Sequence, residues 1–416
     1  MAAMESSGHR LRKRNKELQE IAPTAKARQR AAAETSNIPR YVVDLSLPPA
    51  QRYRHIAEDF KHQIVSLPVL FDEVVQSIHP RISVRRVRSA AQLLLRRIHD
   101  KEQDEELKGI HNVTGVHMYM LVAFNVLLDL FMGCTSGGFQ ITPKDEGSRM
   151  LHFRTLDWGM DALRQIVVHL DFIQQSGGPV YASSVTYVGY VGVLTGVKKG
   201  LSMSLNFRPN HDASTRLANF RFYFHHLLVL FGFQPSISSM LRQILLPSGA
   251  RIKQQGASGQ TLDSIQTFLP ALPTTAAYLI FCDGDRTVTM EKDHHTAVVK
   301  SAEDFIAITN HDEAEELEPE KMKNERSKSN KALEVTGMTE LAQESISRKL
   351  CTTRQWERSR STSSRAGSKA MPRGLEKVTK LLKTYPITNE ETHYAVVMDP
   401  KAGNVVWERR YLEPVN

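Results

Sequence analysis

The chain has 416 residues, of which 41% are hydrophobic, so it can bury a sizeable core in one large domain or two ordinary ones. Its cysteines, Cys134, Cys282 and Cys351, are too few for a disulfide framework and are compatible with a reducing compartment. The formal net charge of +9 raises the question of an anionic partner, either a nucleic acid or a membrane surface.

The basic residues gather in polar segments rather than beside aromatic ones. They are dense in residues 1–36 and between Arg354 and Lys380, where Trp356 is the one aromatic neighbour that could stack. Surfaces that bind nucleic acids combine positive charge with stacking rings, so no nucleic-acid partner is expected. The preferred interpretation of residues 1–36 is a disordered, solvated tail, and peripheral contact with an anionic membrane is the alternative.

Residues 1–36 show no apolar segment followed by a small-residue cleavage site, so no secretory signal is predicted and a cytoplasmic location is favoured. The run from Val116 to Met132 is the candidate for a membrane span, but it contains His117, Asn125 and Asp129, which are costly in hydrocarbon. We therefore interpret the run as a buried helix.

The segment 37–133 is predicted to be mainly helical. After a short strand at Tyr41–Leu45, apolar residues recur at helical spacing from Gln51 to Ile78, with a break near Pro68. A third helix is predicted over Val84–Asp100.

From residue 134 the hydrophobic period changes to that of strands. Strands are predicted over 139–141, 150–154, 166–172, 185–190, 193–196, 201–206, 276–282, 287–292 and 305–310, with a closing hairpin at 394–398 and 405–408. Helices are predicted between Ser214 and Leu246 and near Ser264. This order of strands, helices and more strands indicates an α+β fold. Residues 313–375 are charged and of low complexity, so a disordered insertion is expected there.

Cys134 follows a long apolar run and is flanked by Gly133 and Thr135. If the Gly133–Cys134 bond were cut, Cys134 would carry a thiol and a free α-amine, whose unperturbed pKa is about 7.7–8.0. The residue would then contain nucleophile and general base together, without a separate catalytic histidine. In the uncut chain the same nitrogen is an amide, so no activity on an external substrate is expected.

Arg154 and Asp157 lie three residues apart on a predicted strand. Asp157 could hold the amine, and Arg154 could stabilise a thiolate and a tetrahedral oxyanion. Residues three apart on a regular strand face opposite sides, so a bulge or strand end is expected if both reach Cys134. From the spacing alone, an ordinary exposed ion pair is the preferred interpretation.

No metal or cofactor is expected. Adjacent histidines, as in His225–His226 and His294–His295, cannot both face one ion from a regular element, and no CxxC or HExxH motif accompanies them. The glycines between Gly189 and Gly200 lack the GK[ST] ending of a phosphate-binding loop.

Four motifs together resemble the acid ceramidase and N-acylethanolamine-hydrolyzing acid amidase family, in its order and rough spacing. They are Gly133–Ser136, Arg154–Gly159, Gly189–Gly196 and Thr309–Asp312. The resemblance covers residues from about 40 to 326 and the final hairpin. It implies a four-layer αββα sandwich of the N-terminal-nucleophile hydrolase type, with a helical pro-segment at 37–133 and a catalytic segment at 134–416.

By position, the resemblance implies that autocleavage after Gly133 exposes Cys134 as the nucleophile. It makes Arg154 and Asp157 the positioning pair, and it gives the amide of Asn310 a part in the oxyanion hole.

Two positions near the site fit the family's sequence pattern less well. Arg326 corresponds to a later family arginine, although inserted residues make that alignment poor. Phe207 stands where the family has a glutamate, so a carboxylate expected near the site is missing. The missing signal and the sparse cysteines also depart from the lysosomal members, so a lysosomal or vacuolar location rests on the resemblance alone.

The sequence therefore predicts a self-cleaving cysteine amidohydrolase that acts on an N-acyl lipid, ceramide first and N-acylethanolamine second, with its own N-terminal fragment as a partner. Two other classes stay open. One is a catalytically silent relative that binds lipid and is impaired by Phe207. The other is a basic adaptor that uses its tails on nucleic acid or anionic membrane.

Overall fold

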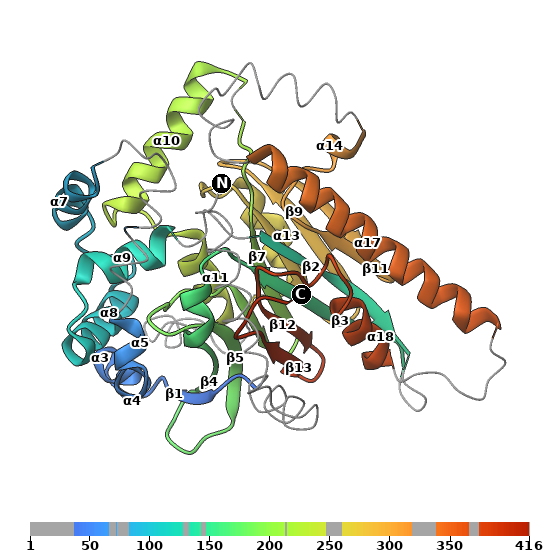
Figure 1. Cartoon of the computed structure of the whole chain (residues 1–416), viewed down its shortest axis with the longest axis horizontal. Helices are drawn as coiled ribbons and strands as arrows, with labels where there is room; N and C mark the ends of the chain where they lie inside the picture. The colour runs from blue at the N-terminus through green and yellow to red at the C-terminus, as the bar shows by residue number, and fades with distance from the viewer. Residues whose placement is uncertain are drawn as a thin grey trace, which may run out of the picture. The chain divides into compact units, whose positions relative to one another are not determined.

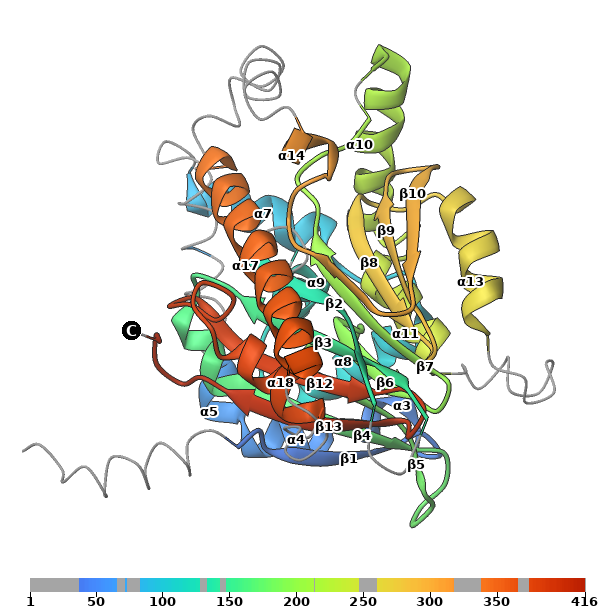
Figure 2. The same cartoon turned by 90° about the vertical axis from the view of Figure 1, so that its right-hand side faces the viewer.

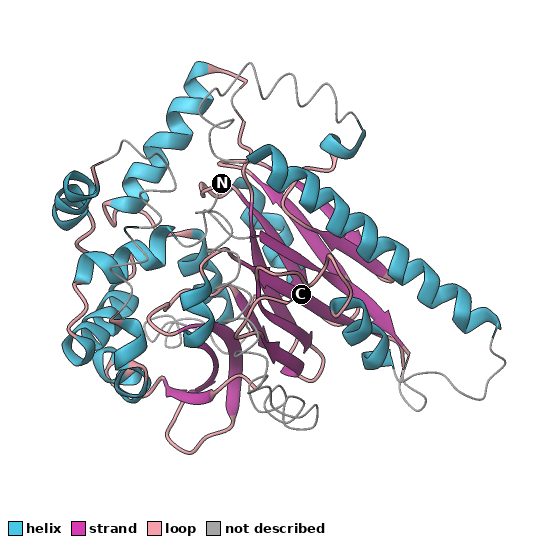
Figure 3. Cartoon of the chain, viewed as in Figure 1, coloured by secondary structure: helices cyan, strands magenta, loops and turns pink. Residues whose placement is uncertain are grey.

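Two β-sheets that pack face to face occupy the middle of the computed structural model (Figures 1 and 3). The structure describes residues 37–65, 72, 83–127, 133–142, 147–212, 214–246, 260–317, 338–365 and 374–415. The predicted tail at 1–36 lies outside these residues, and the described chain from Ile38 onward belongs to one compact unit.

The larger sheet has eight described strands, in the order β1-β4-β5-β6-β7-β8-β9-β10. β1 (Arg40–Asp44) pairs in parallel with β4 (Val167–Ile173), and the other neighbours are antiparallel. The remaining strands are β5 (Val180–Tyr187), β6 (Thr195–Lys198), β7 (Leu201–Phe207), β8 (Ala277–Cys282), β9 (Thr287–Lys292) and β10 (Ala297–Ala302). Because β1 precedes residue 133, the segment before the predicted cleavage site supplies an edge strand.

The smaller sheet has five described strands, in the antiparallel order β11-β2-β3-β12-β13. They are β11 (Phe305–Ile308), β2 (Gly133–Ile141), β3 (Arg149–Asp157), β12 (Thr392–Asp399) and β13 (Asn404–Arg410). The hairpin predicted near the C-terminus is present as β12–β13 and ends this sheet.

Helices cover the outer face of each sheet (Figure 2). α17 (Met338–Arg365) and α18 (Gly374–Leu382) pack on the smaller sheet, where the Trp356 ring stacks on Phe305 with centroids 4.7 Å apart. α11 (Ile237–Leu245) packs on β6 and β7 of the larger sheet. The predicted α+β class with an αββα layering is confirmed.

The remaining helices lie mainly before residue 128, as the sequence predicts. They are α3 (Pro49–Arg52), α4 (Arg54–Asp59), α5 (Lys61–Ile64), α7 (Val84–Leu94), α8 (Lys101–Thr114) and α9 (Met118–Leu127), followed later by α10 (Arg216–Leu230), α13 (Leu262–Phe268) and α14 (Ala314–Leu317), with 3₁₀ turns at Asp161–Ile166 and Leu269–Ala271. The predicted third helix ends early, at Leu94, because Asp100 starts a new one by accepting a hydrogen bond from Gln103 N.

α9 is the described part of the apolar run considered as a membrane span. Its Asn125 side chain donates to Gly189 O and accepts from Val191 N, both at 2.8 Å, so the polar group is satisfied inside the protein. Across the described residues, no helix is long and apolar enough to cross a bilayer.

Alternation along β2 and β3 decides which residues lie between the sheets. Phe139 and Phe153 belong to the apolar cluster under α17 and α18, whereas Cys134 and Leu156 belong to the central core. The sheets approach closely here, since a Cβ on Gly138 would lie 2.0 Å from Thr287 Oγ1 of β9.

The expected disordered insertion at 313–375 is wrong over its described residues, because α14 and the long helix α17 occupy them. The buried face of α17 follows helical spacing through Ala342, Ser345, Arg348 and Thr352. Most of these residues are polar, so composition alone gave no sign of a packed helix.

His169 of β4 joins the two sheets at one side. Its Nδ1 contacts Glu408 Oε2 of β13 at 2.5 Å, and its Nε2 contacts Asp171 Oδ1 at 3.1 Å. Burial opposes the charged imidazole, but the hydrogen bonds to Asp171 and Glu408 outweigh it and raise the pKa of His169.

We expect His169→Gln to lower the free energy of unfolding by about 1.5–3 kcal/mol below pH 6.5, the range of a hydrogen bond to a charged group. The loss should shrink as the pH rises through the raised pKa, because the folded protein then no longer binds the extra proton. Urea unfolding at pH 6 and pH 9, with the exposed His62→Gln as control, measures this. An equal loss at both pH values would contradict the assignment.

Candidate active site

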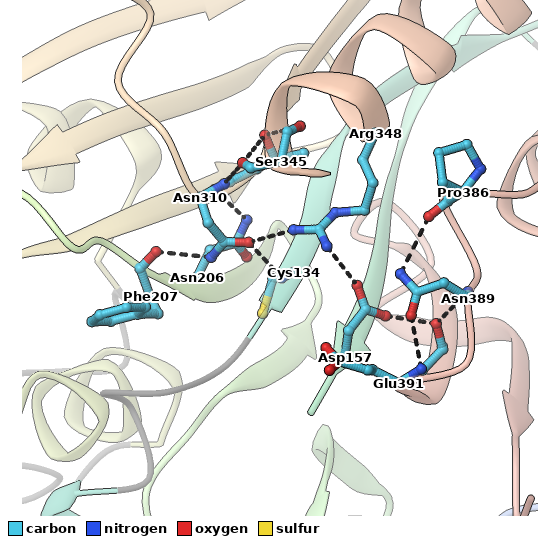
Figure 4. Close-up of polar contacts among 12 residues, drawn as sticks. Cys134, Asp157, Asn206, Phe207, Asn310, Ser345, Arg348, Pro386, Asn389 and Glu391 are labelled. Atoms are coloured by element: carbon cyan, nitrogen blue, oxygen red, sulfur yellow. Dashed lines mark hydrogen bonds and ion pairs between the residues drawn. The ribbon is translucent and has the colours of Figure 1, made fainter. Parts of the chain in front are cut away.

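Cys134 lies near the start of β2, and its side chain is fully buried. Its backbone N–H donates to Asn310 Oδ1 at 2.7 Å (Figure 4), and Arg154 Nη2 donates to its Sγ at 3.2 Å. The structure thus brings together three of the predicted site residues, from β2, from β3 and from the segment after β11.

Arg154 is held rigidly between the two sheets. Its Nη1 donates to the carbonyl of Leu194 and to Thr195 Oγ1, the latter at 2.7 Å. Thr195 Oγ1 lies 3.0 Å from the hydroxyl of Tyr394 on β12. Arg154 is fully buried, so a charge on the thiol would be met by a fixed cation rather than by water.

Asp157, at the end of β3, is also fully buried and contacts a different set of partners. Its Oδ1 accepts a hydrogen bond from Thr392 Oγ1 at 2.7 Å, and its Oδ2 lies 3.7 Å from Arg348 Nη1. Arg348 Nη2 in turn donates to Asn310 Oδ1 at 2.8 Å. Figure 4 shows this guanidinium between Asp157 and Asn310.

Arg348 is the site residue that sequence reasoning missed. It belongs to α17, inside the segment expected to be disordered. Arg326, the predicted counterpart of the family arginine, lies outside the described residues. No apolar periodicity marks its position, because Ser345, Arg348 and Thr352 on the buried face of α17 are all polar.

Arg154 and Asp157 leave β3 on opposite faces, as strand geometry requires. The bulge expected in β3 is not what brings both to the site, because Arg154 reaches the thiol between the sheets while Asp157 meets Arg348. The irregularity of register lies in β12 instead, between Thr392 and Tyr394. The preferred interpretation of an exposed ion pair is therefore wrong.

Asn310 is fixed by three contacts of its side chain and one of its backbone. Its Oδ1 accepts from Cys134 N and from Arg348, its Nδ2 donates to Phe207 O at 2.8 Å, and its backbone N–H donates to Ser345 Oγ at 2.6 Å. A donor at Oδ1 and an acceptor at Nδ2 agree with this orientation of the amide. The predicted part of Asn310 in an oxyanion hole stays a prediction.

The ring of Phe207 is buried where a family carboxylate was expected. The polar link at this point comes from its neighbour Asn206, whose Oδ1 accepts from Ser136 Oγ at 2.7 Å and whose Nδ2 donates to Ile308 O at 3.3 Å. Asn206 thereby ties β7 of the larger sheet to β2 and β11 of the smaller one.

Burial governs the protonation of the site in the uncut chain. Burial raises the pKa of the Cys134 thiol, and the neighbouring Arg154 only partly opposes it. Burial likewise raises the pKa of Asp157, and Arg348 is the main opposing charge. The thiol is therefore protonated at neutral pH before any cleavage. Among the described residues, no group of His, Cys, Asp and Glu could hold a metal ion.

Two packed sheets between helical layers, with a cysteine near the start of an inner strand, form the αββα layering that the sequence predicts for a fold of the N-terminal-nucleophile hydrolase type. A family model for the beta subunit of N-acylethanolamine-hydrolyzing acid amidase matches residues 36–99.

Several curated proteins are similar to this chain. Mouse acid ceramidase is 29% identical over 189 residues, which is 41% of this chain and 46% of that protein. Human acid ceramidase is 28% identical over 186 residues, with the same coverage. The N-acylethanolamine-hydrolyzing acid amidase of Caenorhabditis elegans is 32% identical over 179 residues, 40% of this chain and 47% of that protein.

A solved Caenorhabditis elegans ortholog of N-acylethanolamine-hydrolyzing acid amidase matches with a TM-score of 0.43 and 19% identity, over 64% of this chain and 93% of that one. The chain spans about half the length of the curated relatives it matches. These similarities support the resemblance to acid ceramidase and N-acylethanolamine-hydrolyzing acid amidase that the motifs indicate.

Arg348→Met should lower the free energy of unfolding by about 3–5 kcal/mol, because it leaves the carboxylate of Asp157 buried without its countercharge. Adding Asp157→Asn should recover most of that loss. Chemical denaturation of the single and double variants measures the coupling, and Arg354→Met, at an exposed position of the same helix, serves as control. Strictly additive losses would show that the two side chains do not interact.

Proposed function

We propose that this protein is an N-acyl amide hydrolase that activates itself by cutting its Gly133–Cys134 bond. The observation that carries the proposal is that two side chains form hydrogen bonds with Cys134, one at its nitrogen and one at its sulfur. Asn310 accepts a hydrogen bond from its nitrogen at 2.7 Å, and Arg154 donates one to its sulfur at 3.2 Å. Nucleophile and future general base are thus both positioned within one residue.

In the proposed activation, Cys134 Sγ attacks the carbonyl carbon of Gly133. The Gly133–Cys134 amide bond breaks, the thiol proton passes to the departing nitrogen, and a thioester joins Gly133 to Sγ. Water then hydrolyses the thioester, which leaves a carboxylate on Gly133 and a free thiol and amine on Cys134. The buried pair of Asp157 and Arg348 lies beside this bond, since a Cβ on Gly133 would be 3.3 Å from Asp157 Cβ.

In the proposed turnover, the α-amine of Cys134 takes the thiol proton, and the thiolate attacks the amide carbonyl of the substrate. The amine gives the proton to the leaving amine, and an acyl thioester remains until water releases the fatty acid. Arg154 stabilises the thiolate, and Asn310 with backbone N–H groups holds the oxyanion.

The proposed substrate is a long-chain N-acyl lipid, ceramide before N-acylethanolamine. Each buried CH₂ can contribute about 0.8 kcal/mol, and a long acyl chain has many such groups. One headgroup hydrogen bond contributes only about 1 kcal/mol, so the acyl chain dominates the affinity. The relatives named for ceramide and for N-acylethanolamine resemble this chain to similar degrees, 29% and 32%. The choice of headgroup is therefore the finer part of the proposal.

The fragment before Cys134 is proposed to stay bound after cleavage. Glu106 of α8 is fully buried and accepts from Arg242 of α11 at 2.6 Å, across the two prospective fragments. β1 pairs with β4 along its whole length, and Asn125 holds the loop at Gly189. Separating the fragments would leave Arg242 without the carboxylate of Glu106, which would keep only Arg52 of its own fragment as a partner.

Contact with a lipid surface is proposed for α10. Apolar side chains are exposed at helical spacing along this helix, and basic residues flank them. The exposed apolar residues, which we call the α10 stripe, are Leu217, Phe220, Tyr223, Phe224 and Leu227. Arg216 and Arg221 are exposed on the same helix. The apolar side chains would contact the acyl region of a membrane surface, and the arginines would contact its anionic headgroups.

Self-cleavage should yield a fragment that begins Cys134-Thr135-Ser136, whereas Cys134→Ala should stay whole because it has no nucleophile. Intact mass and N-terminal sequencing after incubation at neutral and acidic pH measure this, with the buried Cys282→Ala as the matched control. The cut protein should then release fatty acid from ceramide or N-acylethanolamine. A wild-type chain that stays whole under every condition would favour a catalytically silent, lipid-binding relative.

The double variant Phe220→Ser/Phe224→Ser should bind vesicles that contain phosphatidylserine at least about tenfold more weakly, since each inserted Phe contributes about 1.5–3 kcal/mol. Co-sedimentation measures the partitioning. Val298→Ser removes an exposed apolar residue from β10 instead and should leave binding unchanged. Equal binding by all three proteins would rule out the α10 stripe as the contact.

A further inference from the structure

A small cavity lies between α10, α9 and the strands β7 and β8. Its lining includes Val229 and Leu230 of α10, Val126 of α9, and Asn206 of β7, which contacts the strand that carries Cys134. The cavity has a volume of about 70 Å³. A cavity that admits benzene has about 150 Å³, so a long acyl chain cannot enter here unless a wall moves.

The α10 wall is joined to the β9–β10 turn by histidines. The rings of His225 on α10 and His294 in the turn have centroids 4.8 Å apart, and His294 lies 4.1 Å from His295. His226, the neighbour of His225, lines the cavity itself. His294 Nδ1 contacts Thr274 O at 3.1 Å, next to residues that form the opposite wall.

The groups that face these histidines are nearly all basic. Those around His225 are His226, His294, His295 and Lys292, and those around His226 are His211 and His294. Those around His294 are His295, Lys292 and Asp293.

The carboxylate facing the histidines, Asp293, is already engaged. It contacts Arg208 Nη1 at 3.1 Å and accepts from the backbone N–H of Asp212 at 2.7 Å. Lys292 adds a positive charge whenever it is protonated, and burial lowers its pKa to about 8. A proton on any histidine of the group would therefore meet like charges at short range.

We propose that His225, His226 and His294 form a latch that holds α10 over the cavity while they are neutral and releases it when they are protonated. Release would widen the cavity towards the strand of Cys134. As a control of substrate access, the latch rests on the proposed function. The movement of α10 itself does not.

Burial of the histidines determines whether acid favours the closed or the open position of α10. Burial, together with the neighbouring cations, lowers the pKa of His225 to about 4 and lowers that of His226 and His294 as well. The closed protein therefore binds fewer protons than the open one, so opening becomes more favourable as the pH falls below about 6.5. His225 Nε2 is buried and has no hydrogen-bond partner among the described residues, so protonation there gains no compensating contact.

Hydrogen–deuterium exchange of the uncut Cys134→Ala chain tests the latch without any catalytic activity. Exchange times are scaled for the intrinsic pH dependence, and peptides from α10 are compared with peptides from β12. From pH 7.4 to pH 4.5 the protection of α10 should fall at least about tenfold more than that of β12.

Two variants of the same chain distinguish the latch from general acid loosening. His225→Phe keeps an apolar ring but cannot be protonated, so the pH-dependent loss should shrink to the part that His226 and His294 contribute. His225→Lys, charged at neutral pH, should expose α10 already at pH 7.4 while β12 stays protected. The exposed His62→Gln is the matched control and should behave as the parent chain.

The latch is wrong if α10 and β12 lose protection together, if His225→Phe behaves as the parent chain, or if His225→Lys leaves α10 protected at pH 7.4. Because the chain in this experiment cannot cut itself, such a result leaves the proposed amidase untouched. Conversely, if α10 opens as expected in a protein that shows no amidase activity, the latch is supported and the proposed function is not.

Discussion

The buried carboxylate of Asp157 is the constraint on which the candidate site depends. A charge removed from water is tolerated only when a countercharge lies close to it. That countercharge, Arg348, comes from α17, and its second amino group reaches Asn310 Oδ1 at 2.8 Å. Asn310 in turn holds the nitrogen of Cys134. One electrostatic requirement therefore draws together a strand, a loop and a helix that are distant in the chain.

Strand geometry divides the control of Cys134 between two layers. Because Arg154 and Asp157 lie on opposite faces of β3, the sulfur is held from between the sheets and the nitrogen from the side covered by α17. Thiol and nitrogen thus experience different environments, although they belong to one residue. The proposed cleavage, which would turn the amide of Cys134 into an amine, would need this separation, since the thiol and the amine would have to be tuned independently.

Part of this arrangement could be predicted from the sequence, since apolar alternation defines most of β3 and the β12–β13 hairpin. Of β2 only residues 139–141 are predicted, because the stretch from Gly133 to Gly138 that carries Cys134 has no apolar alternation. Cys134, Arg154 and Asn310 meet because these strands pair in register. Arg348 could not be found in that way. The buried face of α17 contains Ser345, Arg348 and Thr352, so a rule that counts apolar residues reads the segment as solvated, and tertiary contacts alone make it a packed helix.

α10 is the opposite of α17, whose buried face is polar. α10 is apolar nearly all round, and yet about half of it is exposed. A helix of this kind loses little apolar burial when it moves away from its support, provided that something apolar receives it. Its inner side is attached partly through histidines rather than through aliphatic packing alone. Imidazole contacts can be reversed by a single proton, whereas aliphatic burial cannot. In the proposed latch, a wall attached in this way combines a closed cavity at neutral pH with an open one under acid conditions, where the proposed acyl-chain substrate would enter without a change in the sheets that position Cys134.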